Sequence, residues 1–86
     1  MRRLRMKAAA KNIERFRADF VERVAALMRE RHLEQADLAR LLGVNSSYIS
    51  ILLSGNRSLK LDTMAKIAAA LGMEIRLELV NPRPGE

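Results

Sequence analysis

The sequence contains no cysteine, which excludes disulfides, thiolate metal sites and cysteine nucleophiles and suits a reducing cytoplasm. It also lacks the run of about 20 apolar residues that a membrane span needs, and no hydrophobic secretory segment follows the basic N-terminus. We therefore expect a cytoplasmic protein with no membrane partner. Tryptophan is absent, and the aromatic residues are only Phe16, Phe20 and Tyr48. The core must then consist of Leu, Ile, Val, Met and Ala, as in a small helical domain.

Residues that could support catalysis or hold a cofactor are equally scarce. The single histidine, His32, has no second metal ligand within a helical turn, and no glycine-rich phosphate loop is present. The acidic residues are scattered along the surfaces of expected helices. We therefore predict no catalytic residue, no metal and no cofactor, so the protein is not expected to be an enzyme. No domain for a small-molecule effector is visible either.

Positive charge is abundant and is concentrated at one end of the chain. The 86 residues carry 16 Lys and Arg against 10 Asp and Glu, a net charge of +6. Residues 1–17 account for the whole excess, and the remainder sums to zero. We interpret residues 1–11 as a basic arm whose charged members are Arg2, Arg3, Arg5, Lys7 and Lys11. Such an arm favours polyanions, either nucleic acid or an anionic membrane surface.

Apolar spacing predicts a long first helix over residues 8–31. Its apolar residues recur every three or four positions, as expected for a stripe that faces the core: Ile13, Phe16, Phe20, Val24, Leu27 and Met28. Acidic residues interrupt the basic ones on the other face, which disfavours a helix lying on a membrane.

Two short helices are predicted next, over residues 34–42 and 46–54. Leu38, Leu41 and Leu42 lie on one face of the first, and Gly43 is placed as its left-handed stop. Asn45 is a good N-cap for the second, which ends at Gly55. Two helices of about eight residues joined by a short glycine-containing turn form a helix-turn-helix.

Residues 41–55 are uncharged, although the protein as a whole is strongly basic. At 100° per residue, Ile49, Leu52 and Leu53 share the core face of the third helix. The opposite face carries small hydroxyl side chains and one isoleucine: Ser46, Ser47, Ser50, Ser54 and Ile51. Small side chains let a helix backbone approach a partner closely, and a DNA major groove admits a helix and offers partners for serine hydroxyls and for an apolar methyl contact.

A fourth helix is predicted over residues 62–71, capped by Asp62 or its neighbour and stopped by Gly72. Residues 73–80 then alternate apolar and charged, which predicts a half-buried strand. No other segment reads as a strand, so this one needs a partner from another chain. We predict a homodimer in which Ile75, Leu77 and Leu79 form a two-stranded ribbon over the ends of the first and fourth helices. The expected organisation is an arm (1–11), a domain (12–80) containing the strand, and a tail (81–86).

Residues 33–72, LEQADLARLLGVNSSYISILLSGNRSLKLDTMAKIAAALG, resemble the lambda-repressor-like helix-turn-helix family of phage repressors, Cro proteins and XRE-type regulators. The likeness is in the order and spacing of Gln, Leu-Ala, Gly-Val-Asn, Ile-Ser, Ser-Gly-Asn and Leu-Gly. It implies a lambda-repressor-like helix-turn-helix domain. With the long first helix and the C-terminal strand predicted above, we expect a mainly α fold of four to five helices and one strand that pairs across a dimer.

The resemblance also implies a role for individual residues. Base-reading positions would be Ser46, Ser47, Ser50 and Ile51, and phosphate-contacting positions would be Gln35, Asn45, Tyr48, Asn56, Arg57 and Lys60. Ser46 and Ser47 depart from the commoner Gln or Arg. Because serine makes no bidentate pair with a base, water or DNA shape should share the discrimination.

These features predict a sequence-specific, double-stranded-DNA-binding transcriptional regulator, a repressor that binds a palindromic operator as a homodimer. The alternative within the same class is an antitoxin of HigA type, which represses its own promoter and also binds a cognate toxin. A membrane-surface or acidic-protein binder that uses the arm is the alternative from another class.

Overall fold

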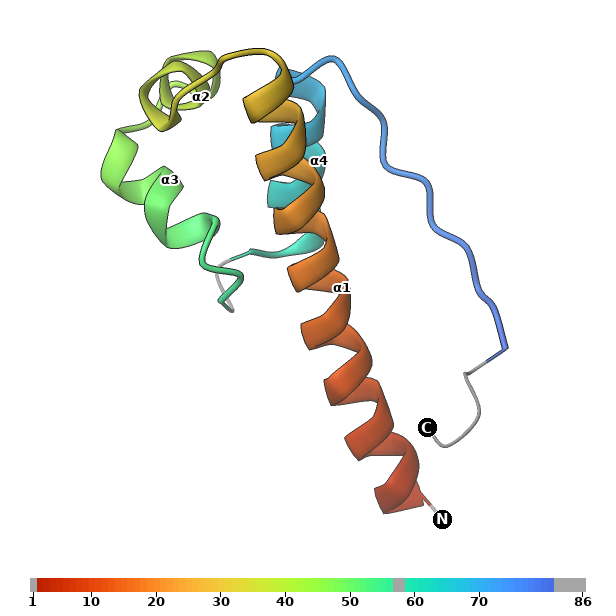
Figure 1. Cartoon of the computed structure of the whole chain (residues 1–86). Coiled ribbons are helices and arrows are strands. Elements are labelled where there is room, and N and C mark those ends of the chain that lie inside the picture. The colour runs from red at the N-terminus through yellow and green to blue at the C-terminus, as the bar shows by residue number, and fades with distance from the viewer. Residues whose placement is uncertain (1, 57–58, 82–86) are drawn as a thin grey trace.

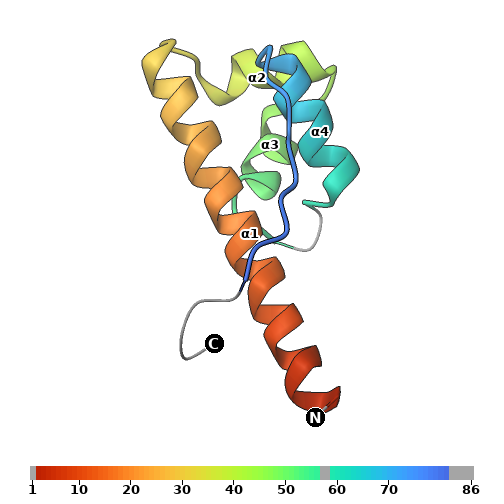
Figure 2. The same cartoon turned by 90° about the vertical axis from the view of Figure 1, so that its right-hand side faces the viewer.

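The computed structural model describes residues 2–56 and 59–81, except for the side chains of residues 2–8. Within these residues the chain forms four helices: α1 (Arg2–Glu30), α2 (Gln35–Leu42), α3 (Ser46–Leu52) and α4 (Leu61–Ala70). A 29-residue helix is about 43 Å long at 1.5 Å per residue. The N-terminal half of α1 therefore projects beyond the cluster formed by the other helices (Figures 1 and 2).

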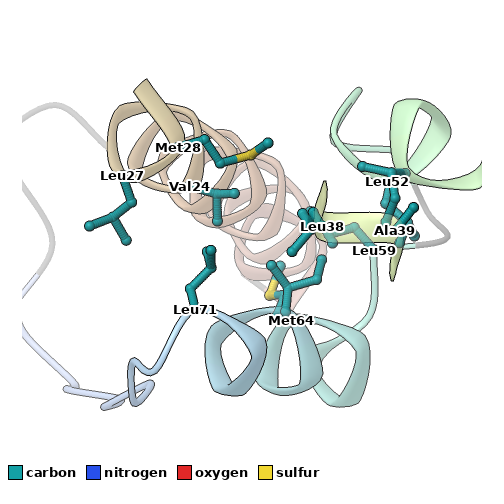
Figure 3. Close-up of a cluster of buried hydrophobic side chains, with 11 residues drawn as sticks. Val24, Leu27, Met28, Leu38, Ala39, Leu52, Leu59, Met64 and Leu71 are labelled. Carbon is teal, nitrogen blue, oxygen red and sulfur yellow. The ribbon is translucent and has the colours of Figure 1, made fainter. Parts of the chain in front are cut away.

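The core lies where α2, α3 and α4 meet the C-terminal half of α1. Val24, Leu27 and Met28 of α1 face Met64 and Leu71 from the α4 side (Figure 3). The largest fully buried side chains come from α2, α3, α4 and the loop before α4: Leu38, Ile49, Leu52, Leu59, Met64 and Ile67. As the composition predicted, this core is aliphatic apart from methionine.

Two glycines end helices as the sequence predicted. Gly43 adopts φ 70° after α2, a left-handed conformation in which a Cβ is disfavoured. Gly72 adopts the same φ after α4, and the amide of Met73 donates to the carbonyl of Ala68 at 2.8 Å. The guanidinium of Arg31 also donates to the carbonyl of Leu71. The last turn of α4 is thus bound to the residue that follows α1.

The helix bounds differ from the predicted ones at several ends. The first helix begins at Arg2 rather than near residue 8, and α3 ends at Leu52 rather than Ser54. The N-cap of α4 is Lys60, without a side-chain hydrogen bond, and not Asp62. Asp62 lies inside the first turn, where its carboxylate accepts a hydrogen bond from the amide of Thr63 at 2.8 Å. Its negative charge also interacts favourably with the positive end of the helix dipole.

The predicted core face was wrong at three positions. Leu41 is 57% exposed, whereas Leu38 and Ala39 are buried. The buried face of α2 is centred between Leu38 and Ala39, and at 100° per residue Leu41 falls roughly 110° from that centre. Ile13 and Phe16 are 50% and 39% exposed because only the first turn of α4 reaches this part of α1 and covers them incompletely.

The strand predicted over residues 73–80 is not formed. This segment is extended but has no regular secondary structure, and the described part of the chain contains no strand. The reason is physical: a strand exists only through hydrogen bonds to a neighbouring strand, and a single copy of this chain offers none. The segment runs along the side of the molecule opposite α3 (Figures 1 and 2).

The assignment of faces predicts a contrast between two leucines. Leu52→Ala should lower the free energy of unfolding by about 2–5 kcal/mol, because it leaves a cavity in the core. Leu41→Ala should change it by less than about 0.5 kcal/mol, because Leu41 is already more than half exposed and lies outside the core. Urea unfolding followed by helical circular dichroism measures both. Equal losses would contradict this description of α2 and α3.

Candidate nucleic-acid interface

The local geometry of α2 and α3 is that of a helix-turn-helix. The helices contain 8 and 7 residues, and residues 43–45 form the turn between them. The left-handed Gly43 lets the chain reverse at once, and the amide of Val44 donates to the carbonyl of Ala39 at 3.0 Å. The turn therefore closes α2 before α3 begins. It places α3 at the outer edge of the helical cluster (Figure 1).

Asn45 starts α3 as the sequence predicted. Its side-chain Oδ1 accepts a hydrogen bond from the amide of Tyr48 at 2.8 Å, which satisfies one of the unpaired donors at the helix N-terminus. This cap is the main local stabilisation of a helix of only 7 residues, a length that is unstable by itself.

The two faces of α3 are divided as predicted. Ile49 and Leu52 are buried and Leu53 is partly buried against the core. The other face is exposed and carries the four residues that sequence reasoning assigned to base reading: Ser46, Ser47, Ser50 and Ile51. Tyr48 lies at the flank and is also exposed. The structure thus brings these side chains together on one uncharged surface.

The start of α2 is more acidic than the sequence analysis recognised. Gln35 is exposed, but it stands between Glu34 and Asp37, which form a reciprocal capping box. The amide of Glu34 donates to Asp37 Oδ2 at 2.7 Å, and Arg40 forms an ion pair with Asp37. Two carboxylates at this helix end disfavour a bound phosphate, and Arg40 offsets only part of their charge.

The loop after α3 holds further predicted phosphate contacts. Asn56 and Lys60 are exposed on it, and Arg57 lies outside the described residues. Ser54, which is exposed, donates its hydroxyl to the carbonyl of Ile51 at 2.6 Å. The loop is anchored by Leu59, whose side chain is fully buried.

Arg17 helps to position the loop after α3, a role that sequence reasoning missed. Its Nε donates to the carbonyl of Leu59 at 3.1 Å, which connects α1 to the loop that carries Lys60. The two residues are 42 positions apart, so no local pattern could reveal the contact.

The basic arm is placed apart from α3. Residues 2–11 continue α1, and Lys11 is exposed. The side chains of Arg2, Arg3, Arg5 and Lys7 lie outside the description. This end of α1 points away from α3 in both views (Figures 1 and 2).

The three residues assigned to the dimer strand differ in burial. Ile75 packs against the core, whereas Leu77 is 64% and Leu79 92% exposed. Exposure therefore rises along the segment as it leaves the helical cluster.

Two features of other kinds of site are absent from the described residues. Across residues 2–56 and 59–81, no group of three or more histidines and acids is arranged to hold a metal ion. In the same residues, no helix combines the length and the apolar character needed to cross a membrane.

The fold and this surface define a helix-turn-helix protein with an uncharged outer helix. A helix-turn-helix family model matches residues 24–77, more than half of the chain. The protein therefore belongs to the XRE, lambda-repressor-like helix-turn-helix family, a family of DNA-binding regulators. Comparisons with curated proteins and with solved structures found no match.

The cap of α3 gives a prediction about stability. Asn45→Ala should lower the free energy of unfolding by about 0.5–2 kcal/mol, because the amide of Tyr48 loses its acceptor. Asn45→Asp and Asn45→Ser should retain most of the wild-type free energy of unfolding, since both side chains cap equally well. Thermal and urea unfolding measure the series. A loss as large for Asp as for Ala would show that the side-chain oxygen is not the stabilising group.

Proposed function

We propose that the protein is a sequence-specific transcriptional repressor that binds a palindromic operator as a homodimer. The observation that carries the proposal is the uncharged outer face of α3. The inner face of this helix is buried and holds it in place within a DNA-binding domain. A major groove about 12 Å wide admits a helix of this kind. Small side chains let the helix backbone approach the base edges closely.

In this proposal α3 reads bases through Ser47 and Ile51, with Ser46 and Ser50 beside them. Serine hydroxyls donate to or accept from base edges, and the exposed isoleucine contacts a thymine methyl group. None of these makes a bidentate pair. Part of the discrimination then falls to bridging water and to the shape of the DNA.

Affinity comes from phosphate contacts around this uncharged helix. We assign them to Asn45, Tyr48, Asn56, Arg57 and Lys60. Gln35 makes a weaker contact than its place at the start of α2 suggests, because Glu34 and Asp37 lie on either side of it. The positive charge available for phosphate contacts near α3 is thus concentrated on the loop that follows it, which Arg17 anchors.

The direct test is selection of bound sequences from a random duplex library by the full chain. A repressor of this kind should enrich a two-fold symmetric motif whose half-sites lie about one helical turn apart, ~34 Å. That motif should also occur upstream of the protein's own gene. Enrichment of no sequence over the starting library would contradict sequence-specific binding.

A second candidate in the same class is an antitoxin that represses its own promoter and binds a toxin. The unpaired backbone of residues 74–81 supports it, because a strand of another protein could form hydrogen bonds with these residues. Co-expression with the product of the adjacent gene, followed by co-purification and a growth assay, separates the two. Neutralisation of a toxic neighbour would establish the antitoxin; a harmless neighbour that does not co-purify would exclude that gene product as the partner.

The assignment of base-reading residues gives a prediction. Ser47→Ala and Ile51→Ala should each change the preference at one or two operator positions by about 1–3 kcal/mol and leave nonspecific affinity nearly unchanged. Ser54→Ala is the matched control, because its hydroxyl bonds to the backbone carbonyl of Ile51. Competition binding with single-position operator variants measures the effect. If Ser47→Ala and Ile51→Ala behave like Ser54→Ala, α3 is not the reading helix.

The basic arm gives a prediction about salt dependence. We propose that it contacts phosphates outside the stretch occupied by α3 of the same chain, since its end of α1 points away from α3. Replacing its five basic residues with Gln keeps the length of α1 and should weaken binding to all sequences alike. Each lost contact should reduce the slope of log affinity against log salt by about 0.9.

Lys66→Gln, at an exposed position of α4, is the control for that series, and it should leave the slope unchanged. An unchanged slope in the arm variant would show that the arm does not contact DNA.

A further inference from the structure

An apolar groove lies beside the projecting half of α1. Ile13 and Phe16 of α1 line it together with Leu61 and Met64 of α4 and with Leu77. Ile13, Leu61 and Leu77 are each at least half exposed. Leu79 and Val80 continue this apolar surface beyond the groove, at 92% and 73% exposure. Together these side chains expose on the order of several hundred Å², the size at which a patch on a monomer marks an interaction site.

The backbone beside this groove is also unpaired. The amide of Met73 completes the end of α4, but within the described residues the backbone from Glu74 to Asn81 forms no hydrogen bond to other backbone groups. Ile75, Leu77 and Leu79 lie on one side of the extended segment, and Glu74, Arg76 and Glu78 on the other. An extended, unpaired segment with one apolar side is suited to adding a strand.

We propose that a second copy of the chain covers this surface, with residues 73–81 of the two copies paired antiparallel and Leu77 on the two-fold axis. The proposal rests on the homodimer inferred above and specifies its contact surface and register. Two boundaries determine the register. Gly72 is left-handed and ends α4, and Pro82 has no amide to donate. The midpoint of the nine residues between them is Leu77, so only this centre lets both copies pair along their full length.

The charged residues support the same register, with Leu77 at the centre of the paired segments. With Leu77 opposite Leu77, Arg76 of each copy lies opposite Glu78 of the other, and Ile75 lies opposite Leu79. Two Arg–Glu pairs then lie on one face, and the central pairs on the other face are all apolar. Towards the ends of the ribbon, Glu74 lies opposite Val80 and Met73 opposite Asn81. Arg76 already bonds to Glu74 of its own chain at 3.1 Å, on an exposed surface where exchange for a new partner costs little.

Neighbouring registers are unfavourable for identifiable reasons. A shift by one residue places apolar side chains opposite charged ones. A centre on Arg76 or on Glu78 sets like charges opposite each other. A centre on Ile75 restores opposite charges but places Leu79 against Leu71, which belongs to the end of α4 and is buried.

The occupant is therefore a copy of this chain rather than an unrelated protein. A segment with Arg just before its midpoint and Glu just after it is complementary to itself in antiparallel orientation. The pairing also brings a second Leu77 and Leu79 over the groove lined by Ile13 and Phe16. A stable interface needs about 800 Å² from each partner, so pairing of the two segments must be accompanied by covering of the apolar groove.

Single cysteines test the register directly, because the chain has none of its own. Opposed residues in an antiparallel pair have Cα atoms about 4.5–5.5 Å apart, within the range that a disulfide spans. Leu77→Cys should therefore form a disulfide-linked dimer on mild oxidation. Leu79→Cys is the matched control, since its two copies would be separated by four residues of strand, about 13 Å. Efficient cross-linking of Leu79→Cys, or none of Leu77→Cys in a protein that sediments as a dimer, would overturn the proposal.

Charge exchange is the second test. Arg76→Glu and Glu78→Arg each create two like-charge pairs per homodimer and should raise its dissociation constant roughly tenfold. An equimolar mixture of the two variants should form a heterodimer of wild-type affinity, because every pair is then Glu opposite Arg. Sedimentation measures the dimer dissociation constant of each variant alone and of the mixture. A mixture that associates no more tightly than its components would overturn the register.

These outcomes are distinguishable from failure of the proposed function. A wild-type chain that is monomeric at tens of micromolar yet selects a DNA motif would overturn the dimer and leave sequence-specific binding intact. A cross-linked Leu77→Cys dimer that selects no motif would do the reverse.

Discussion

The burial of Ile49 and Leu52 in the shared core is the contact on which the proposed DNA-facing surface of α3 depends. A helix of 7 residues has too few internal hydrogen bonds to be stable in water. Its order comes from those two side chains, both almost completely buried, and from the cap that Asn45 provides. The side chains that pack α3 against the core therefore lie on one side of the helix. The opposite side is free to carry the small residues that close approach to a base pair requires.

This division explains why a strongly basic protein presents an uncharged helix. A long cation on the outer face of α3 would hold the helix backbone away from the floor of a groove, while serine does not. In the proposed complex, positive charge is supplied instead from the loop after α3 and from the N-terminal end of α1. The loop is held in place by buried Leu59 and by the hydrogen bond from Arg17. The acids at the start of α2 have the opposite effect, so the positive potential around α3 is uneven.

Local signals in the sequence were sufficient wherever one residue determines a backbone conformation. Gly43, Asn45 and Gly72 each have a conformational role that follows from residue type, and each is found in that role. Periodicity correctly indicated an apolar stripe on α1 but gave no information about how far its neighbours extend, so Ile13 and Phe16 were misassigned to the core. For α2 the pattern placed Leu38, Leu41 and Leu42 on one core face, but tertiary packing leaves Leu41 exposed and Leu42 partly buried. Arg17 could not be predicted, because its partner is a carbonyl group 42 residues away.

The extended C-terminal segment and α3 occupy opposite sides of the molecule, with α1 and α4 between them (Figure 1). A surface that binds a second copy therefore does not compete with a surface that binds DNA. Two copies paired at this segment would each keep α3 available for one half-site of a palindrome.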